Sequence, residues 1–345
     1  MSGFLAPPPD GPLRRSRRPS FSVLIAAHNV AHLIGDAIES ALAQTVPPLE
    51  VIVSDDGSTD DLDGALAPYG DRIVLLRKEH GGEASAKNAA AEAARGELAV
   101  FLDGDDAFLP RRLEALGALA EERPDLDILT TDAFLVLHGR TVRRCYEGGW
   151  TFPVRDQRHE ILRRNFIFGH AAVRPERLFG AGGFDESIRW TTDWDLWLRL
   201  ILDGARAGAV SEPLALYRLR ETSLSADRER LLRGKLSTLE KARAHPALHP
   251  DERPVLERAL AGYRRELRLS ELRGDLSSPR AGTRRRALDV AVAPGFAPLH
   301  RLEAMAAALA PELAGRVVRR RAQRFWTAAG GVRVDRRRRT TAAPR

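Results

Sequence analysis

Residues 98–106 read Leu-Ala-Val-Phe-Leu-Asp-Gly-Asp-Asp, the segment most informative about the fold class. Its first five residues form a short apolar run, typical of a strand that is buried on both faces of a parallel sheet. Similar runs precede it, and helical patterns with one apolar face separate them. Strands are expected at 21–27, 50–54, 72–77 and 98–102, and helices at 31–43, 84–95 and 110–122. This alternation predicts an α/β domain with a doubly wound, mostly parallel sheet and flanking helices.

Polar and small residues directly follow three of these strands. They read Ala27-His-Asn29, Asp55-Asp-Gly57 and Asp103-Gly-Asp-Asp106. In an open parallel sheet, ligands bind outside the carboxyl ends of the strands. Carboxylates that converge there repel one another unless a cation joins them, and Mg²⁺ or Mn²⁺ prefers such oxygen ligands. The pattern therefore predicts a divalent ion that bridges a diphosphate to the protein, although residues 55–60 also fit a turn with a helix N-cap.

Composition and missing motifs exclude several classes of protein. The 345 residues are 43% hydrophobic and 29% charged, which suits a folded chain with a sizeable core. No apolar run reaches the ~18–20 residues of a membrane span, and residues 1–20 lack the apolar centre of a secretory signal. The single cysteine, Cys145, suits a reducing compartment, so we expect a cytoplasmic protein. The absence of a Gly-x-x-x-x-Gly-Lys-Ser/Thr loop, and of Gly-x-Gly-x-x-Gly after the first strand, counts against P-loop and dinucleotide enzymes.

Charge divides the chain unevenly. Residues 226–345 contain 28 Lys or Arg against 13 Asp or Glu, in a chain whose net charge is +7. We expect a disordered, basic and Pro-rich arm (1–20), an α/β domain (21–225), a basic helical extension (226–330) and a disordered basic tail (331–345). In the extension, one helical stripe carries Leu302, Met305, Leu309, Leu313 and Val317. The stripe fits either packing on the α/β domain or peripheral contact with a membrane.

Five short motifs follow one another along the first third of the chain. They are Ser22-Val-Leu-Ile-Ala-Ala-His-Asn29, Ser40-Ala-Leu-Ala-Gln-Thr45, Glu50-Val-Ile-Val-Ser-Asp-Asp-Gly-Ser-Thr-Asp60, Ala86-Lys-Asn-Ala89 and Gly96-Glu-Leu-Ala-Val-Phe-Leu-Asp-Gly-Asp-Asp106. In this order and spacing they resemble the family 2 glycosyltransferases, which have the GT-A fold. The resemblance continues through Gly182-Gly-Phe-Asp-Glu186 and Thr192-Asp-Trp-Asp-Leu-Trp-Leu198. It implies a nucleotide-sugar-binding half (21–122) and an acceptor half (123–225).

The resemblance implies roles for the matching residues of the first half. Asp56 would accept a hydrogen bond from the base, and Lys87, where the family usually has Arg, would approach the base or the diphosphate. Asp103 and Asp105 form the Asp-x-Asp motif that holds Mn²⁺ or Mg²⁺, with Asp105 the expected principal metal ligand and Asp103 nearer the ribose. The implied donor is a nucleotide-sugar, most commonly a UDP-sugar in this family. The full expected set is Ala26, His28, Asn29, Asp56, Lys87, Asp103, Gly104 and Asp105.

The resemblance places the catalytic base in the second half. Asp193 stands in the slot of the family's Glu-Asp motif, with Thr192 in place of Glu. It would deprotonate the acceptor hydroxyl in a single inverting displacement while the metal neutralises the leaving diphosphate. Apolar neighbours would raise the pKa of this carboxylate. Trp190 and Trp194 would line the acceptor side, and core packing at helical spacing is the alternative for Trp194.

Three further residues complete the expected acceptor and lid region. His170 lies in the stretch that faces the acceptor in the family, and a purely structural hydrogen bond is the alternative. Arg218 and Arg220 lie in a loop that resembles the family's lid, and Arg220 stands where a His metal ligand often occurs. Either arginine could clamp diphosphate oxygens, and an exposed loop position is the alternative.

The sequence as a whole predicts a cytoplasmic glycosyltransferase that acts on a saccharide or lipid-linked acceptor, with possible peripheral membrane contact. Three other readings stay open. A catalytically inert protein could bind the nucleotide-sugar without transferring it. A nucleotidyltransferase could use a similar sheet, although it would normally carry a Gly-rich loop after the first strand. A basic scaffold or RNA-associated protein could act through 226–345, which shows no recognisable nucleic-acid-binding motif.

Overall fold

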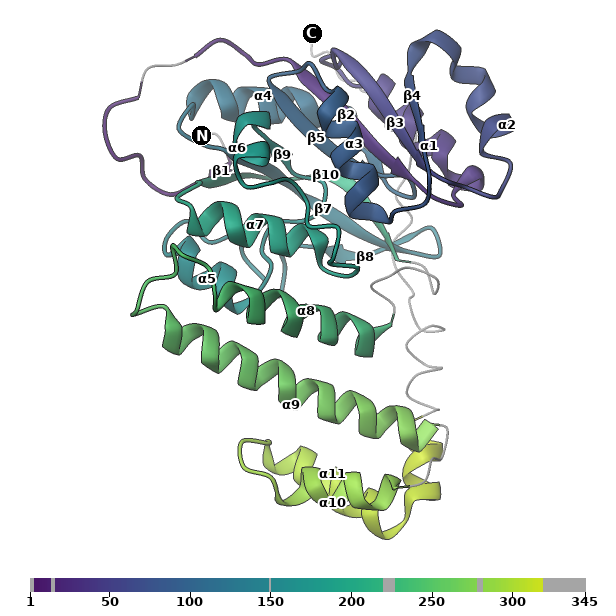
Figure 1. Cartoon of the computed structure of the whole chain (residues 1–345), viewed down its shortest axis with the longest axis vertical. Helices are drawn as coiled ribbons and strands as arrows, with labels where there is room; N and C mark the ends of the chain where they lie inside the picture. Colours follow the sequence, from purple (N-terminus) through teal and green to yellow (C-terminus); the bar gives the residue numbers. More distant parts are fainter. Residues whose placement is uncertain (1–2, 14–15, 149, 220–226, 278–281, 319–345) are drawn as a thin grey trace, which may run out of the picture.

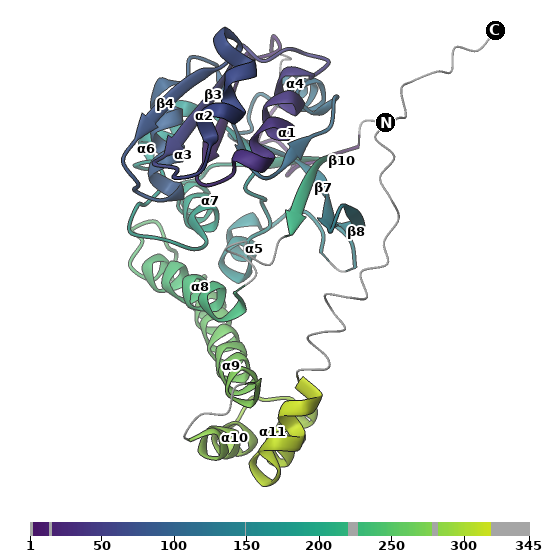
Figure 2. The same ribbon diagram turned by 90° about the vertical axis from the view of Figure 1, so that its right-hand side faces the viewer.

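The computed structural model describes residues 3–13, 16–148, 150–219, 227–277 and 282–318. One sheet with helices on both faces forms the larger body, and a column of helices extends away from it (Figures 1 and 2). The strands are β1 (Phe4–Leu5), β2 (Phe21–Ala27), β3 (Glu50–Asp56), β4 (Val74–Lys78), β5 (Leu98–Asp103), β6 (Ala107–Phe108), β7 (Ile128–Leu137), β8 (Arg140–Arg144), β9 (Ala172–Val173) and β10 (Ala207–Leu219). The helices are α1 (Ala31–Leu42), α2 (Leu62–Leu66), the 3-10 helix η1 (Ala67–Arg72), α3 (Glu83–Ala93), α4 (Arg112–Glu122), α5 (Gln157–Arg163), α6 (Pro175–Gly180), α7 (Thr192–Leu202), α8 (Arg228–Ala242), α9 (Arg253–Ser277), α10 (Thr283–Val292) and α11 (Pro298–Leu309).

The sheet runs in the order β1-β10-β7-β9-β5-β2-β3-β4. β5, β2, β3 and β4 run parallel to one another, as the strand–helix alternation predicts. The short strand β9 pairs antiparallel with both β5 and β7, and β7 is again parallel to β10. The sheet is therefore parallel across 21–103 and mixed beyond, and β9 joins its two parts.

Side chains along the central strands alternate between two hydrophobic cores, because successive residues of a strand point to opposite faces. Leu24 and Phe101 belong to a core that includes residues of α3, α5 and α7. Val23 and Val100 belong to a second core with α1 and α4. The central strands are thus covered on both sides. This burial fixes where each strand ends and so positions the residues that follow it.

The N-terminal arm differs from the disordered segment that the sequence suggests. Phe4 and Leu5 pair antiparallel with Val210 and Ala209 of β10. Arg123 also donates a hydrogen bond of 2.7 Å to the Pro7 carbonyl. This pairing at the edge of the sheet supplies hydrogen-bond partners to the backbone groups of only two residues. A strand of two residues is too short to be recognised from the sequence of a Pro-rich segment.

The C-terminal extension is helical over its described residues, as expected. Apolar residues near the start of α9, including Leu256 and Leu260, pack into the core beside α7. Leu272 and Leu276, near its end, belong to a separate small core with α10 and α11. The expected disordered tail at 331–345 lies outside the described residues. None of the described helices has the length and apolarity that crossing a membrane requires.

Candidate active site

The carboxyl ends of β2, β3 and β5 lie side by side in register. Ala26 of β2 pairs with Ser54 on one side and with Asp103 on the other. The Gly104 amide donates a hydrogen bond of 3.2 Å to the Ala26 carbonyl oxygen, and a Cβ at Gly104 would lie only 3.0 Å from that oxygen. The chain can turn this close to β2 because residue 104 is glycine. Three of the expected site residues, Ala26, Asp103 and Gly104, therefore meet at this edge.

The buried carboxylate of Asp56 is held by donors that follow β4. Lys78 Nζ and the Gly81 amide donate to Oδ1, each at 2.8 Å, and the Gly82 amide donates to Oδ2 at 2.7 Å. Burial alone would raise the pKa of Asp56, but these hydrogen bonds outweigh burial and hold its pKa below the ordinary value. Asp56 is thus a fixed negative charge at the end of β3.

Two histidines stack beside Asp56. The His28 and His80 rings have centroids 4.3 Å apart and planes 28° apart. His28 Nδ1 lies 2.9 Å from the Asp56 carbonyl oxygen, and His80 Nδ1 lies 2.9 Å from Oδ2 of the same residue. The next residue, Asn29, has a positive φ of 53°, and its Oδ1 accepts a hydrogen bond of 2.8 Å from the Thr59 amide. The predicted residues at 28, 29 and 56 therefore form one connected group.

The loop at 55–60 also shows the turn and capping contacts of the alternative reading. The Ser58 amide donates to Asp55 Oδ1 at 2.9 Å, and Asp60 Oδ2 accepts from the Ala31 amide at 2.8 Å. The side-chain cap of α2 is Asp61, which accepts from the Gly64 amide at 3.1 Å. These local contacts hold the loop in place beside the site.

Lys87 is a fully buried cation between two carboxylates. Its Nζ lies 2.5 Å from Glu83 Oε1 and 2.9 Å from Asp103 Oδ1. Burial would lower the pKa of Lys87, but the charges of Asp103 and Glu83 outweigh burial and raise its pKa. Burial would likewise raise the pKa of Asp103, and the charge of Lys87 holds that pKa below the ordinary value. Both groups are therefore charged at neutral pH, and Lys87 ties the start of α3 to the end of β5.

Asp193 faces the same space as Asp103. A Cβ added to Gly169 would lie 3.6 Å from Asp103 Oδ2 and 3.9 Å from Asp193 Oδ2, so both carboxylates lie close to this glycine. Asp193 lies in the first turn of α7, and its Oδ2 accepts a hydrogen bond of 2.9 Å from the Asn165 amide group. Burial raises the pKa of Asp193 to about 6, although the charge of Lys87 opposes this shift. A carboxylate with this pKa can accept a proton near neutral pH.

Asp106 and His170 form a buried pair behind the Asp-x-Asp turn. His170 Nε2 lies 2.5 Å from Asp106 Oδ2. Burial raises the pKa of Asp106 to about 6. The imidazole makes edge contacts with the Phe108 and Tyr217 rings, and only 2% of His170 is exposed. His170 therefore contacts the turn from the protein interior through Asp106. It is not exposed to an acceptor, as the sequence suggested it would be.

Arg218 lies beside the same turn. Its guanidinium donates to Asp36 Oδ2 at 2.8 Å and to the Asp105 carbonyl oxygen at 3.0 Å, and its amide donates to Asp106 Oδ1 at 2.7 Å. Arg218 therefore lies within β10 with its guanidinium already paired, and not in the loop that the sequence suggested. Arg220, the other expected lid residue, lies outside the described residues.

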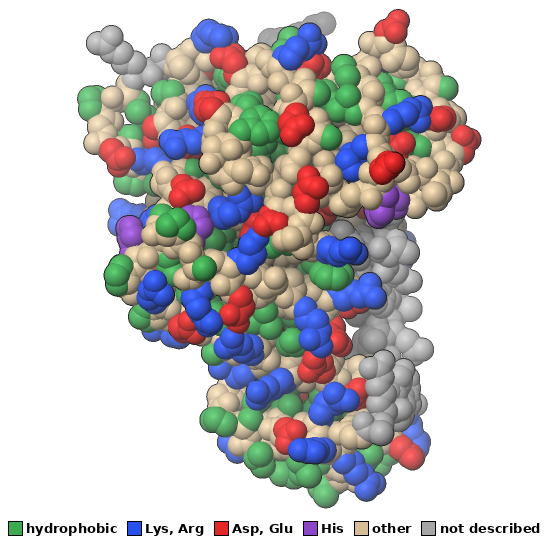
Figure 3. All heavy atoms as spheres, in the orientation of Figure 1, with side chains coloured by type: hydrophobic (Ala, Val, Ile, Leu, Met, Phe, Trp, Pro, Cys, Tyr) green, Lys and Arg blue, Asp and Glu red, His purple; other side chains and the backbone are tan. Residues whose placement is uncertain are grey.

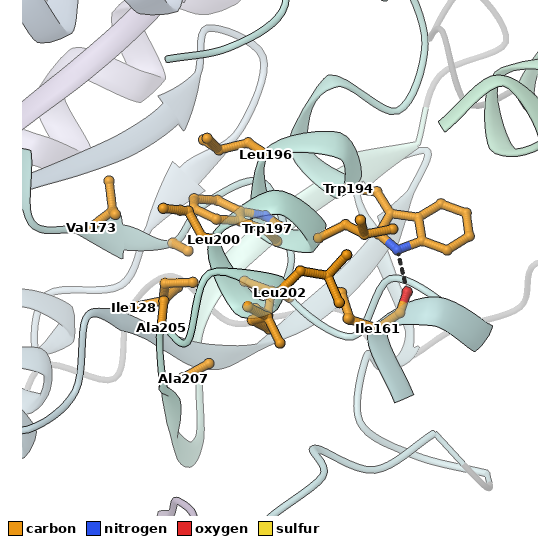
Figure 4. Close-up of a cluster of buried hydrophobic side chains, with 14 of the residues drawn as sticks. Ile128, Ile161, Val173, Trp194, Leu196, Trp197, Leu200, Leu202, Ala205 and Ala207 are labelled. Atoms are coloured by element: carbon orange, nitrogen blue, oxygen red, sulfur yellow. Dashed lines mark hydrogen bonds between the residues drawn. The ribbon is translucent and has the colours of Figure 1, made fainter. Parts of the chain in front are cut away.

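The tryptophans of α7 belong mainly to the core. Trp194 is 1% exposed, and its indole N–H donates a hydrogen bond of 2.8 Å to the Ile161 carbonyl oxygen (Figure 4). Trp197 lies among Leu200, Val173 and other apolar side chains (Figure 4). Trp194 therefore does not line an acceptor site, because both its ring and its polar atom are satisfied inside the protein. Trp190, before α7, is only half-buried and packs against α8.

Two groups of described residues bring possible metal-ligand atoms within 4.8 Å of one another. One is Asp103, Asp106 and His170, and the other is His28, Asp56 and His80. Of the two expected metal ligands, Asp103 belongs to the first group. Asp105 lies between Asp103 and Asp106 in the same turn and is half-buried. The oxygen-rich turn has the donor type that Mg²⁺ and Mn²⁺ prefer, so its residues fit a hard divalent ion.

Several residues of this site were missed at the sequence level. Glu83 holds Lys87, Asn165 holds Asp193, and Lys78 and His80 hold Asp56. Burial lowers the pKa of Lys235 of α8, and the charges of Glu266 and Asp193 oppose this shift. The contact between Glu83 and Lys87 could have been predicted from the sequence, because residues four apart lie on the same face of a helix. The other contacts join distant segments and left no local pattern.

Comparison with known sequences supports the reading of these motifs. The family model described as glycosyl transferase family 2 matches residues 22–174. An uncharacterised glycosyltransferase of Rickettsia typhi is 31% identical over 193 residues, which are 53% of this chain and 59% of that protein. A Bacillus subtilis protein named for teichuronic acid biosynthesis, the glycosyltransferase TuaG, is 30% identical over 61% of this chain and 83% of its own length. The chain thus spans less than two thirds of the Rickettsia relative and most of TuaG.

Solved structures share the fold. TarS 1–349 of S. aureus in complex with UDP-GlcNAc superimposes with a TM-score of 0.59 at 18% identity, covering 89% of this chain and 92% of TarS 1–349. The mannosyltransferase PcManGT of Pyrobaculum calidifontis, in complex with GDP-Man and Mn²⁺, gives a TM-score of 0.56 at 24% identity, covering 93% and 89%. The matched share of this chain, 89% and 93%, is larger than the α/β domain alone.

Proposed function

The chain belongs to glycosyl transferase family 2, and from this premise we propose that it transfers a sugar from a nucleotide-diphosphate sugar to a saccharide or lipid-linked acceptor, with inversion at the anomeric carbon. The proposal rests on the approach of both Asp103 and Asp193 to the same glycine, Gly169. One carboxylate follows a strand of the nucleotide-binding half, and the other begins a helix of the acceptor half. Donor and acceptor would meet between them.

The donor would bind along the carboxyl edge of β2, β3 and β5. The stacked rings of His28 and His80 offer an aromatic surface, and Asp56 beside them is held ionised by its hydrogen bonds. A nucleobase has both a flat face and N–H donors, which match these two features. Named ligands of the structural relatives, UDP-GlcNAc and GDP-Man, support a nucleotide-sugar as the donor class. A UDP-sugar is the first candidate.

The metal would bind at the turn 103–106. We assign Asp105 and Asp103 as its ligands, because their oxygens follow β5 at the edge where the diphosphate would lie. When bound, Mn²⁺ or Mg²⁺ neutralises charge on the leaving diphosphate. Lys87 holds Asp103 in place through its ion pair, so the ligand does not need to reorganise. Arg218 fixes the middle of the turn by donating to the Asp105 carbonyl.

Asp193 would act as the general base. The acceptor hydroxyl loses its proton as its oxygen attacks the anomeric carbon, and a carboxylate near that oxygen can receive it. The burial that raises the pKa of Asp193 to about 6 makes it a stronger base than an exposed aspartate. Asn165 donates a hydrogen bond to Oδ2 of Asp193, and the Trp194 amide donates one of 2.7 Å to Oδ1, so the two donors together orient the base.

Donor binding can be tested by thermal unfolding with a panel of nucleotide-sugars, nucleoside diphosphates and nucleoside triphosphates, each with and without Mn²⁺. A donor at 100 times its Kd adds about 2.7 kcal/mol to the free energy of unfolding. We expect stabilisation by one nucleotide-sugar in the presence of metal, and its loss in Asp105→Ala. The matched control is Asp71→Ala, an exposed aspartate outside the site. Stabilisation by a triphosphate alone would instead favour a nucleotidyltransferase.

A further inference from the structure

The end of the helical column carries an unusual concentration of exposed apolar side chains. Among the described residues, fifteen large hydrophobic side chains are exposed, and eight of them lie between residues 288 and 317. Leu302 and Leu309 of α11 are 68% and 77% exposed. We call this set the apolar face, and its members are Leu288, Val292, Leu299, Leu302, Met305, Leu309, Leu313 and Val317.

The apolar face reverses the usual order of an amphipathic helix. In α10 and α11, the residues that point inward are mostly alanines, such as Ala287, Ala304 and Ala307, which pack against Leu272 and Leu276 of α9. The large leucines of the same two helices point outward. Small inward and large outward residues leave large apolar side chains in water, and a concentration of exposed apolar side chains is a mark of interaction sites. α10 and α11 therefore bury only small side chains in their core, and their large apolar side chains are available to a binding partner.

The charges around the apolar face are mainly positive. Between residues 282 and 318 there are five arginines and three acidic residues. Arg286 pairs with Asp275, and Glu303 lies 3.8 Å from Arg273, while Arg284, Arg285 and Arg316 are exposed. Residues 319–345, which follow directly in the sequence, add ten arginines and one aspartate. Figure 3 shows basic and hydrophobic side chains intermingled on the visible side of this end of the molecule.

We propose that the apolar face docks on a membrane surface that contains anionic lipids. Leucine side chains would enter the boundary between headgroups and acyl chains, and the arginines would contact lipid phosphates. A second copy of the chain is a poorer partner, because pairing two such faces would bring two Arg-rich surfaces together. An anionic bilayer can bury the apolar side chains and pair its phosphates with the arginines. This inference goes beyond the proposed transfer reaction and does not depend on it.

The position of the apolar face suits such a contact. α10 and α11 lie at the far end of α9 from the sheet (Figures 1 and 2). α9 is one continuous helix of 25 residues, anchored in the main core at its first half. A surface that touches this end would therefore leave the edge formed by β2, β3 and β5 uncovered.

The test measures binding of the full chain to phosphatidylcholine vesicles with and without 30% phosphatidylglycerol, by flotation at low salt. We expect binding to the anionic vesicles and at least tenfold weaker binding to the neutral ones. The double variant Leu302→Glu/Leu309→Glu should bind anionic vesicles at least tenfold more weakly. The matched control, Leu49→Glu/Val74→Glu, changes two exposed apolar residues of the α/β domain and should bind like the unaltered chain.

The charge contribution is tested separately with Arg284→Glu/Arg285→Glu, against Arg140→Glu as an exposed control from β8. Each basic residue near an anionic surface contributes about fivefold in partitioning, so the double charge reversal should weaken binding by more than tenfold. Light scattering on the same samples reports association between copies. The proposal is overturned if neither vesicle binds the chain, if the control variants lose binding equally, or if the leucine variants abolish a dimer and leave vesicle binding unchanged.

Discussion

Asn165 and Asp193 are joined by a hydrogen bond of 2.9 Å, donated by the Asn165 side-chain amide to Asp193 Oδ2. Asn165 follows α5 and Asp193 opens α7, so contact between two helices sets the position of the proposed base. An N–H donor favours the ionised carboxylate and opposes the burial that raises the pKa of Asp193. Asn165 is thus a positioning residue for the proposed base.

Removing this donor should shift the pH dependence of transfer. In Asn165→Ala, Asp193 loses a hydrogen bond to its charged form, so its pKa rises and the acid limb of the kcat profile moves to higher pH. The measurement is kcat against pH for both proteins. Asn88→Ala is the control, because Asn88 bonds to the Phe184 backbone and not to Asp193. An unshifted acid limb in Asn165→Ala would show that this amide does not act on the base.

In the unaltered chain, kcat should fall in acid with an apparent pKa near 6. A general base must be deprotonated to accept a proton, and burial raises the pKa of Asp193 to about 6. The rate should therefore rise as pH increases from 5 to 7 and then level off. Donor affinity, measured in parallel by calorimetry, separates this effect from titration of the donor site. A rate that is flat between pH 5 and 7 would contradict the assignment.

Replacing Lys87 should unfold the chain more readily. Lys87→Met leaves the carboxylates of Glu83 and Asp103 without their buried cation, and breaking a buried pair in this way costs about 3–5 kcal/mol. The free energy of unfolding in urea provides the measurement. Arg228→Met is the control, because Arg228 pairs with Glu266 at the surface and such pairs contribute about 0–1 kcal/mol. If both variants lost the same free energy of unfolding, the buried ion pairs of Lys87 would contribute no more than a surface ion pair.

Asp56 should stabilise the fold at neutral pH but not in strong acid. Its folded-state pKa lies below the ordinary value, so its contribution is present above that ordinary value and is lost as pH falls through the folded-state pKa. Asp56→Asn should therefore lower the free energy of unfolding at pH 7, and the difference from the unaltered chain should shrink below about pH 4. A constant difference from pH 7 to pH 3 would contradict this linkage.

Trp194 should matter for stability and Trp150 should not. Trp194→Ala removes a buried ring and leaves the Ile161 carbonyl without its donor, which costs about 3–5 kcal/mol for the ring alone. Trp150 is 39% exposed and serves as the control, with an expected loss under about 1 kcal/mol. Thermal unfolding compares the two. A small loss for Trp194→Ala, with weaker acceptor binding, would restore the acceptor role suggested by the sequence.

The sequence carried most of the information on the parallel half of the sheet. Apolar runs such as Leu98–Leu102 and the small or acidic residues after them predict both the strands and the edge at which Asp56 and Asp103 gather, because strand burial and strand ends are local patterns. Trp194 was ambiguous since helical spacing suits a core residue and a binding residue equally. Asn165 and His80 reach the site only through packing between distant segments, which a single sequence does not encode visibly.

The most direct test of the account is the release of nucleoside diphosphate from the stabilising nucleotide-sugar, with Mn²⁺ and a saccharide or lipid-linked acceptor, by the unaltered chain and by Asp193→Asn. The amide keeps the shape of the side chain but cannot act as a base at neutral pH. We predict that kcat falls about 10²–10⁴-fold while donor affinity stays within about twofold. Transfer by Asp193→Asn at the unaltered rate, or no transfer by the unaltered chain from any stabilising donor, would contradict the account.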